Sequence, residues 1–207
     1  MPVMRFFHPV APSRSLKKGP VRVQIAGQKF ALWRDGSDRA AAVADACPHR
    51  KAPLSQGRVR PDGRLACSYH GWHFDAEGRG CSPSQPKLTR CDTAAYQVVE
   101  KFGYLWLSER DTPASTFPLT RWDGFDLAGS FSTLFQAPLH VALDNFSEDE
   151  HFPFIHFFLG WNEDGVSRLE FKAQNYDDRT EVLYRGPSTL FGLASAAGSA
   201  VRRPLSE

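Results

Sequence analysis

The chain has 207 residues, of which 42% are hydrophobic and 23% are charged, and its formal net charge is +2. These values are typical of a folded globular protein with one sizeable core, or with one small domain and part of a second. The small net charge gives no reason to expect a nucleic-acid or membrane partner, and no stretch approaches the roughly 20 apolar residues of a membrane span. The first residues contain no apolar run of signal-peptide length, so we expect a cytoplasmic protein whose four cysteines are metal ligands or free thiols.

Short strand-like runs separated by turn residues fill the first 110 residues. The dipeptide Phe102-Gly103 is expected to join the last two of these runs as a hairpin. The predicted strands are residues 21–25, 29–33, 40–44, 96–101 and 104–108. We therefore predict an all-β antiparallel domain over residues 1–112.

The pattern changes after a connection that contains Pro113 and Pro118. Residues 141–156 are acidic on one side and aromatic on the other, which predicts a helix, and strands are predicted for residues 131–137, 169–173 and 181–184. The fold class is therefore α+β, with part of a second domain over residues 113–186. Residues 187–207 are rich in small side chains and lack strand alternation, so we expect this tail to be poorly ordered.

Two segments of the β domain combine cysteine and histidine in an unusual way. Cys47-x-His49 lies in "CPHRKAPLSQGRV", and after a gap of 17 residues Cys67-x-x-His70 lies in "CSYHGWHF". Each segment supplies one residue of each type, so two loops closing on a [2Fe-2S] cluster can give both thiolates to one iron and both imidazoles to the other. We predict that these four residues bind such a cluster and that the protein transfers single electrons.

The rival metal interpretation is a structural zinc site with two cysteines and two histidines. Zinc fingers usually pair cysteine with cysteine and histidine with histidine at short spacing, whereas the two types alternate within each segment here. A chance arrangement of core cysteines and surface histidines would need four coincidences. Cys81 and Cys91 lie outside the two segments, and we expect them to be buried or idle thiols.

At these residues the sequence resembles the Rieske proteins, and the phrase "CPHR(x)APLS…C(x)YHGW(x)F" is similar to the oxygenase branch of that family. The resemblance covers roughly residues 5–110. Respiratory Rieske proteins carry two additional cysteines that bridge the loops, and Ala52 and Tyr69 stand at those positions. They also place a serine where this chain has Trp72, so fewer donors reach the cluster sulfurs and a lower potential is expected.

The segment "LDNFSEDEHFPFIHFF" resembles a second motif of Rieske oxygenases, in which two histidines and a distant carboxylate bind a mononuclear Fe(II). His151 and His156 match these histidines, and Asn145 matches the asparagine before them. Residues five apart lie about 140° apart around a regular helix. Pro153 lies between the histidines, and we expect it to break or widen the turn so that both can reach one iron.

The chain departs from this family pattern in two ways. The resemblance implies an aspartate that links a cluster histidine of one subunit to an iron histidine of the next, and Glu148 stands there with Asp149 beside it. Either carboxylate could form the link. No acidic residue after His156 stands in a motif that matches the third iron ligand, and family members are longer. We therefore expect a C-terminally truncated catalytic domain that holds mononuclear iron poorly.

The resemblance implies a Rieske non-haem iron oxygenase that hydroxylates or demethylates a small aromatic substrate with dioxygen. Electrons would come from NAD(P)H through a reductase or ferredoxin, and the full-length form would be a homotrimer. Two alternatives are an electron-transfer Rieske protein with a structural extension, and an inactive remnant that still binds the cluster.

Overall fold

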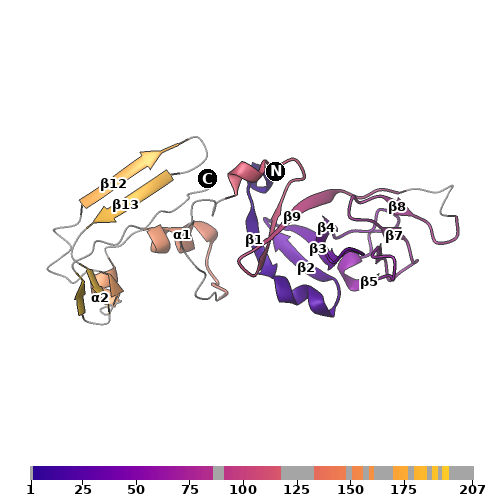
Figure 1. Ribbon diagram of the computed structural model, residues 1–207, viewed down its shortest axis with the longest axis horizontal. Coiled ribbons are helices and arrows are strands. Elements are labelled where there is room, and N and C mark those ends of the chain that lie inside the picture. The colour runs from indigo at the N-terminus through magenta and orange to yellow at the C-terminus, as the bar shows by residue number, and fades with distance from the viewer. Residues whose placement is uncertain are drawn as a thin grey trace. The chain divides into compact units, whose positions relative to one another are not determined.

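A computed structural model covers the chain, and the structure describes residues 2–85, 91–117, 133–147, 151–155, 159–160, 170–176, 180–185, 188–190 and 193–195. The chain divides into two compact units, Met1–Leu127 and Ala128–Glu207 (Figure 1). The boundary predicted after residue 112 falls before this division. In the part of the chain that the structure describes, no helix is long and apolar enough to span a membrane.

Six strands of the first unit form one antiparallel sheet in the order β1-β10-β9-β4-β3-β2. The five strands predicted here are confirmed to within one residue at each end, and β1 is the strand of this sheet that was missed. The strands are β1 (His8–Pro12), β2 (Val21–Ile25), β3 (Gln28–Arg34), β4 (Ala40–Ala44), β9 (Ala95–Lys101) and β10 (Tyr104–Ser108).

Two tight turns set the register of this sheet. Ala26 and Gly27 join β2 to β3, and Phe102 and Gly103 join β9 to β10. All four residues have positive φ, from 46° at Ala26 to 80° at Gly27. Two consecutive left-handed residues are what a type I′ turn requires, and its twist matches that of the flanking strands. The predicted hairpin at Phe102-Gly103 is confirmed.

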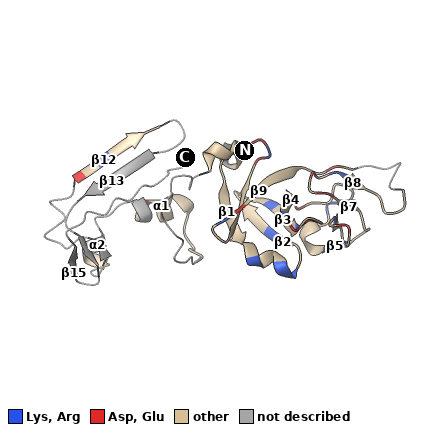
Figure 2. Cartoon of the chain, in the orientation of Figure 1, with Lys and Arg blue, Asp and Glu red and all other residues tan. Residues whose placement is uncertain are grey.

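The central strands β3 and β4 are buried on both faces. Phe30 and Leu32 of β3 pack on one face with Leu105 and other residues of the sheet, and this core is closed by Met4 of η1 (Pro2–Arg5) and Leu16 of η2 (Ser13–Lys18). The basic residues of η2, coloured blue in Figure 2, are exposed and do not belong to this core. Ala31 and Trp33 of β3 point to the opposite face and belong to a second core. This second core positions the candidate site.

A smaller antiparallel sheet lies over the second core, at one end of the first unit (Figure 1). Its order is β5-β6-β7-β8, with the short helix η3 (Leu54–Gln56) just before β5. The indole N–H of Trp33 donates to the Gly63 carbonyl at 3.0 Å and so links the two sheets. The strands are β5 (Arg58–Val59), β6 (Leu65–Ala66), β7 (His73–Phe74) and β8 (Gly80–Cys81), and η4 (Ala114–Thr116) follows β10.

The described residues of the second unit form two helices and five strands. The predicted helix over 141–156 is instead α1 (Leu139–Ser147) and α2 (Phe152–Ile155), with Pro153 in the first turn of α2, where its missing N–H is tolerated. The strands predicted at 169–173 and 181–184 are confirmed as β12 (Glu170–Asn175) and β13 (Thr180–Arg185), which pair with each other.

One expectation for the second unit is wrong. Residues 133–137 form no strand, because the apolar side chains of Leu134 and Phe135 are exposed in an irregular segment that has no partner strand among the described residues. In the tail, which was expected to be poorly ordered, β14 (Ser188–Leu190) pairs with both β11 (Leu159–Gly160) and β15 (Leu193–Ser195). The other residues of the tail lie outside the described residues.

Candidate metal centre

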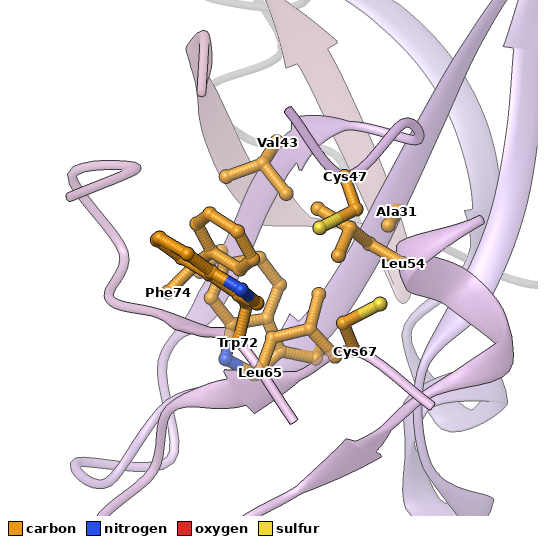
Figure 3. Close-up of a cluster of buried hydrophobic side chains, with 10 residues drawn as sticks. Ala31, Val43, Cys47, Leu54, Leu65, Cys67, Trp72 and Phe74 are labelled. Atoms are coloured by element: carbon orange, nitrogen blue, oxygen red, sulfur yellow. The ribbon is translucent and has the colours of Figure 1, made fainter. Parts of the chain in front are cut away.

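The structure brings the four predicted cluster ligands together and sorts them by exposure. Cys47 and Cys67 are 1% and 2% exposed and belong to the second core (Figure 3). His49 and His70 are exposed, and their ring centroids are 4.9 Å apart. The site therefore has a buried sulfur side and a solvent-facing imidazole side.

The two thiols adjoin each other in the apolar core. The Cys67 thiol lies within hydrogen-bonding reach of the Cys47 thiol, and the backbone N–H groups of His49 and Arg50 also point at the Cys47 sulfur. Burial outweighs these N–H groups and raises the pKa of Cys47 to about 11. Metal binding must therefore displace a proton from this thiol at neutral pH, and the N–H groups are ready donors to the sulfur once it is ionised.

The first ligand loop is closed on itself and then clamped to the large sheet. Within the loop, Cys47 N–H donates to the Ala52 carbonyl at 2.8 Å and Lys51 N–H donates to the Cys47 carbonyl at 2.7 Å. The buried carboxylate of Asp45 accepts the Ser55 N–H at 2.7 Å and the Ser55 hydroxyl at 2.8 Å, so the two ends of the loop are tied together. Arg22 of β2 donates to the same carboxylate.

We expect Asp45→Asn to loosen this loop. The amide nitrogen of asparagine cannot accept a hydrogen bond, so at least one of the three donors loses its partner, which costs about 2 kcal/mol of unfolding free energy. Ser55→Ala removes only the hydroxyl and should cost about 1 kcal/mol. Urea unfolding and iron content of both variants measure the effect, and equal stability of Asp45→Asn and the wild type would contradict the clamp.

The second ligand loop is a tight turn between Cys67 and Trp72. Cys67 N–H donates to the Trp72 carbonyl at 2.7 Å, and Gly71 N–H donates to the Cys67 carbonyl at 3.1 Å. Gly71 has φ 71°, which lets the chain reverse immediately after His70. Trp72 then enters the core, and its ring lies 5.3 Å from that of His49.

The donor set fits a two-iron cluster better than a single zinc ion. Among the described residues, no three cysteine, histidine or acidic side chains converge as one metal ion would require. A Rieske-type cluster divides four ligands between two irons, so only two ligands meet at each. Two adjoining thiols in the core and two neighbouring imidazoles at the surface provide that division.

Comparison with known proteins agrees with this geometry. Residues 6–97 match the family of the Rieske [2Fe-2S] domain. This part of the chain is a Rieske domain. The domain binds a [2Fe-2S] cluster, and the residues present at the site fit that cofactor.

Relatives extend the likeness beyond the Rieske domain. Protein TIC 55 of Pisum sativum is 31% identical over 172 residues, which are 77% of this chain and 31% of the relative. The 4beta-methylsterol monooxygenase of Methylococcus capsulatus is 41% identical over 110 residues, 47% of this chain and 29% of the relative. The chain thus spans about a third of the length of these relatives. A solved dicamba monooxygenase shares the fold, with a TM-score of 0.68 and 23% identity over 93% of this chain and 61% of that protein.

The predicted residues of the mononuclear iron site belong to the second unit. Asn145 is exposed on α1, and His151 is half-buried immediately before α2. The carbonyl of His151 accepts the N–H groups of Phe154 and Ile155 at 3.1 Å and 2.9 Å, so this histidine begins α2. Glu148, Asp149 and His156 lie outside the described residues.

The structure also shows contacts that sequence analysis missed. Cys81, expected to be a buried or idle thiol, is half-buried, and its sulfur lies 3.0 Å from Nε2 of His73 and accepts Nη1–H of Arg64 at 3.3 Å. No sequence pattern indicated the contact between His73 and Cys81, because β7 and β8 have two residues each. No sequence pattern indicated that Asp45 and Ser55 meet across the first ligand loop.

Proposed function

We propose that the protein is the oxygenase component of a Rieske non-haem iron oxygenase. The single observation that carries this proposal is the two-sided Rieske centre, with buried thiols and exposed imidazoles, in a chain that continues into a second folded unit. The oxygenase names of relatives support the reaction class. A bound [2Fe-2S] cluster accepts and releases one electron at a time.

The residues around the site define the side on which electrons enter or leave. His49 and His70 are exposed, and Tyr69, which is 65% exposed, stacks on His70 with the ring centroids 3.8 Å apart. Trp72 and the second core close the opposite side. A redox partner therefore approaches the imidazoles, while the thiol side excludes water.

The second unit would supply the oxygen-activating site. His151 and His156 would hold a mononuclear Fe(II), which supplies open positions for dioxygen when bound. Asn145 and either Glu148 or Asp149 would link this site to the exposed cluster histidines of a neighbouring copy in a homotrimer. A reductase or ferredoxin would deliver NAD(P)H-derived electrons, a small aromatic molecule would be the substrate, and the location would be cytoplasmic.

Replacement of His151 tests the proposal, with His140→Ala of α1 as the matched control. Purified protein is supplied with a reductase, NADH and a panel of methoxylated or methylated aromatic acids. Fe(II) is supplied in excess, because the chain is expected to hold mononuclear iron poorly, and we expect a small amount of dioxygen-dependent product in the wild type and in His140→Ala. His151→Ala should form none while it keeps the cluster signal.

An electron-transfer Rieske protein with a structural extension is the alternative. It would pass electrons to a partner and form no product from any member of the panel. Equal product formation by the wild type and His151→Ala with Fe(II) in excess, including none from either, would support this alternative and contradict the oxygenase proposal.

A further inference from the structure

The second ligand loop leaves one carbonyl group without a backbone donor. Its turn is closed through Cys67 and Trp72, but no backbone N–H in the described part of the chain donates to the Gly71 carbonyl. Instead, Nδ1 of His73 lies 3.3 Å from it. His73 is only 8% exposed, so this contact replaces a hydrogen bond to water in a largely dry environment.

The Gly71 carbonyl oxygen can only accept a hydrogen bond, so Nδ1 of His73 must carry the hydrogen. Nε2 on the other side of the ring faces the Cys81 sulfur at 3.0 Å. The proton between Nε2 and sulfur can belong to either atom, and Nδ1–H donates to Gly71 in both cases. The arrangement therefore does not depend on which of the two carries that proton.

Cys81, which contacts the ring nitrogen of His73 that faces away from Gly71, lies on β8, the edge strand of the small sheet. Arg64 precedes β6 and donates to the Cys81 sulfur of β8. His73 pairs with Ala66 on one side and with Cys81 on the other. Pro83, just after β8, lies close to the turn, since a Cβ at Gly71 would meet its side chain at 3.5 Å. Residues 64, 73 and 81–83 thus hold the turn that carries His70.

We propose that His73 is a positioning residue of the Rieske centre, which acts through the Gly71 carbonyl and is itself fixed by Cys81 and Arg64. The N–H groups of Ser68, Tyr69 and His70 donate to no backbone carbonyl in the described residues, so they are available to the cluster sulfurs. Donors to sulfur favour the reduced state. Release of the Gly71 carbonyl lets the turn move and weakens these donors, which lowers the midpoint potential.

Two substitutions of His73 separate the roles of its two ring nitrogens. Asn places an amide nitrogen near the position of Nδ1, so His73→Asn keeps the donor to Gly71 and loses the contact with Cys81. Gln places its amide near Nε2, so His73→Gln keeps Cys81 and loses Gly71. Redox titration of the purified holoprotein, followed by visible absorption and EPR, needs no substrate, mononuclear iron or partner, so its outcome is independent of the oxygenase proposal.

We expect a smaller decrease of the potential in His73→Asn, which keeps the donor to Gly71 but loses the Cys81 anchor, than in His73→Gln, which loses the donor. At the potential where half of the wild-type cluster is reduced, clearly less than half should be reduced in His73→Gln, and its EPR lines should broaden. Loss of the cluster in His73→Gln, with the cluster kept in His73→Asn, would also support the proposal, because it reports a larger disturbance of the same turn. Equal potentials in both variants and the wild type, or equal shifts in both, would show that His73 only fills space and would overturn the proposal.

Substitutions at Cys81 provide a second test if His73→Gln does not fold. Cys81→Ala removes the anchor of the ring, while Cys81→Ser keeps a hydroxyl that can both donate to Nε2 and accept from Arg64. We expect a lower potential in Cys81→Ala than in Cys81→Ser. Wild-type potentials in both Cys81 variants would contradict the role of this anchor.

Discussion

Cys47→Ala is expected to abolish the cluster, whereas Cys91→Ala should leave it intact. Both cysteines contact the second core, Cys47 as a buried member and Cys91 at its edge. Cys47 differs because its sulfur adjoins the Cys67 thiol and faces the N–H groups of His49 and Arg50. Loss of one thiolate leaves one iron with a single protein ligand, and a cluster of this kind needs all four.

Iron and acid-labile sulfide measured per chain decide this prediction. Cys47→Ala should be colourless, with nearly all iron and sulfide lost, and Cys91→Ala should match the wild type. If Cys47 were only a core cysteine, the two variants would behave alike. Equal iron content in both would therefore contradict the assignment of Cys47 as a ligand.

Gly63→Ala is expected to be the most destabilising small substitution in the Rieske domain. A Cβ at Gly63 would lie 1.9 Å from the backbone nitrogen of Gly36, and Gly63 has φ 78°. Overpacking and the left-handed conformation together should cost about 3 kcal/mol or more of unfolding free energy. The shift would also disturb the Trp33 hydrogen bond that links the two sheets, so cluster content should fall.

Gly103→Ala is the matched control for this prediction. Gly103 has φ 73°, nearly the same as Gly63, but a Cβ there would meet no atom within 4 Å. Only the conformational cost of about 1 kcal/mol remains. Urea unfolding of the two variants gives the comparison, and similar losses of stability would show that the contact with Gly36 does not determine the cost.

The large sheet and the cluster ligands could be predicted from the sequence because both depend on local patterns. Apolar runs and turn residues located β2, β3, β4, β9 and β10, and the cysteine–histidine spacing located Cys47, His49, Cys67 and His70. The strands of the small sheet have two residues each, too few for any periodicity to appear.

Contacts between residues far apart in the chain could not be predicted in this way. The clamp between Arg22 and Asp45 spans 23 residues, and the bond between Arg64 and Cys81 spans 17. Neither pair belongs to a spacing that defines a motif. The apolar residues Leu134 and Phe135 were misread as part of a strand, because apolar character alone does not supply a partner strand.

The central claim is that this chain holds a [2Fe-2S] cluster with mixed cysteine and histidine ligation, and EPR of the reduced holoprotein tests it most directly. Imidazole ligands on one iron lower the average g value below that of an all-cysteine cluster. We predict this low-average-g signal, with about two irons and two sulfides per chain in the cluster. A protein with one zinc per chain, no acid-labile sulfide and no such signal would contradict the account.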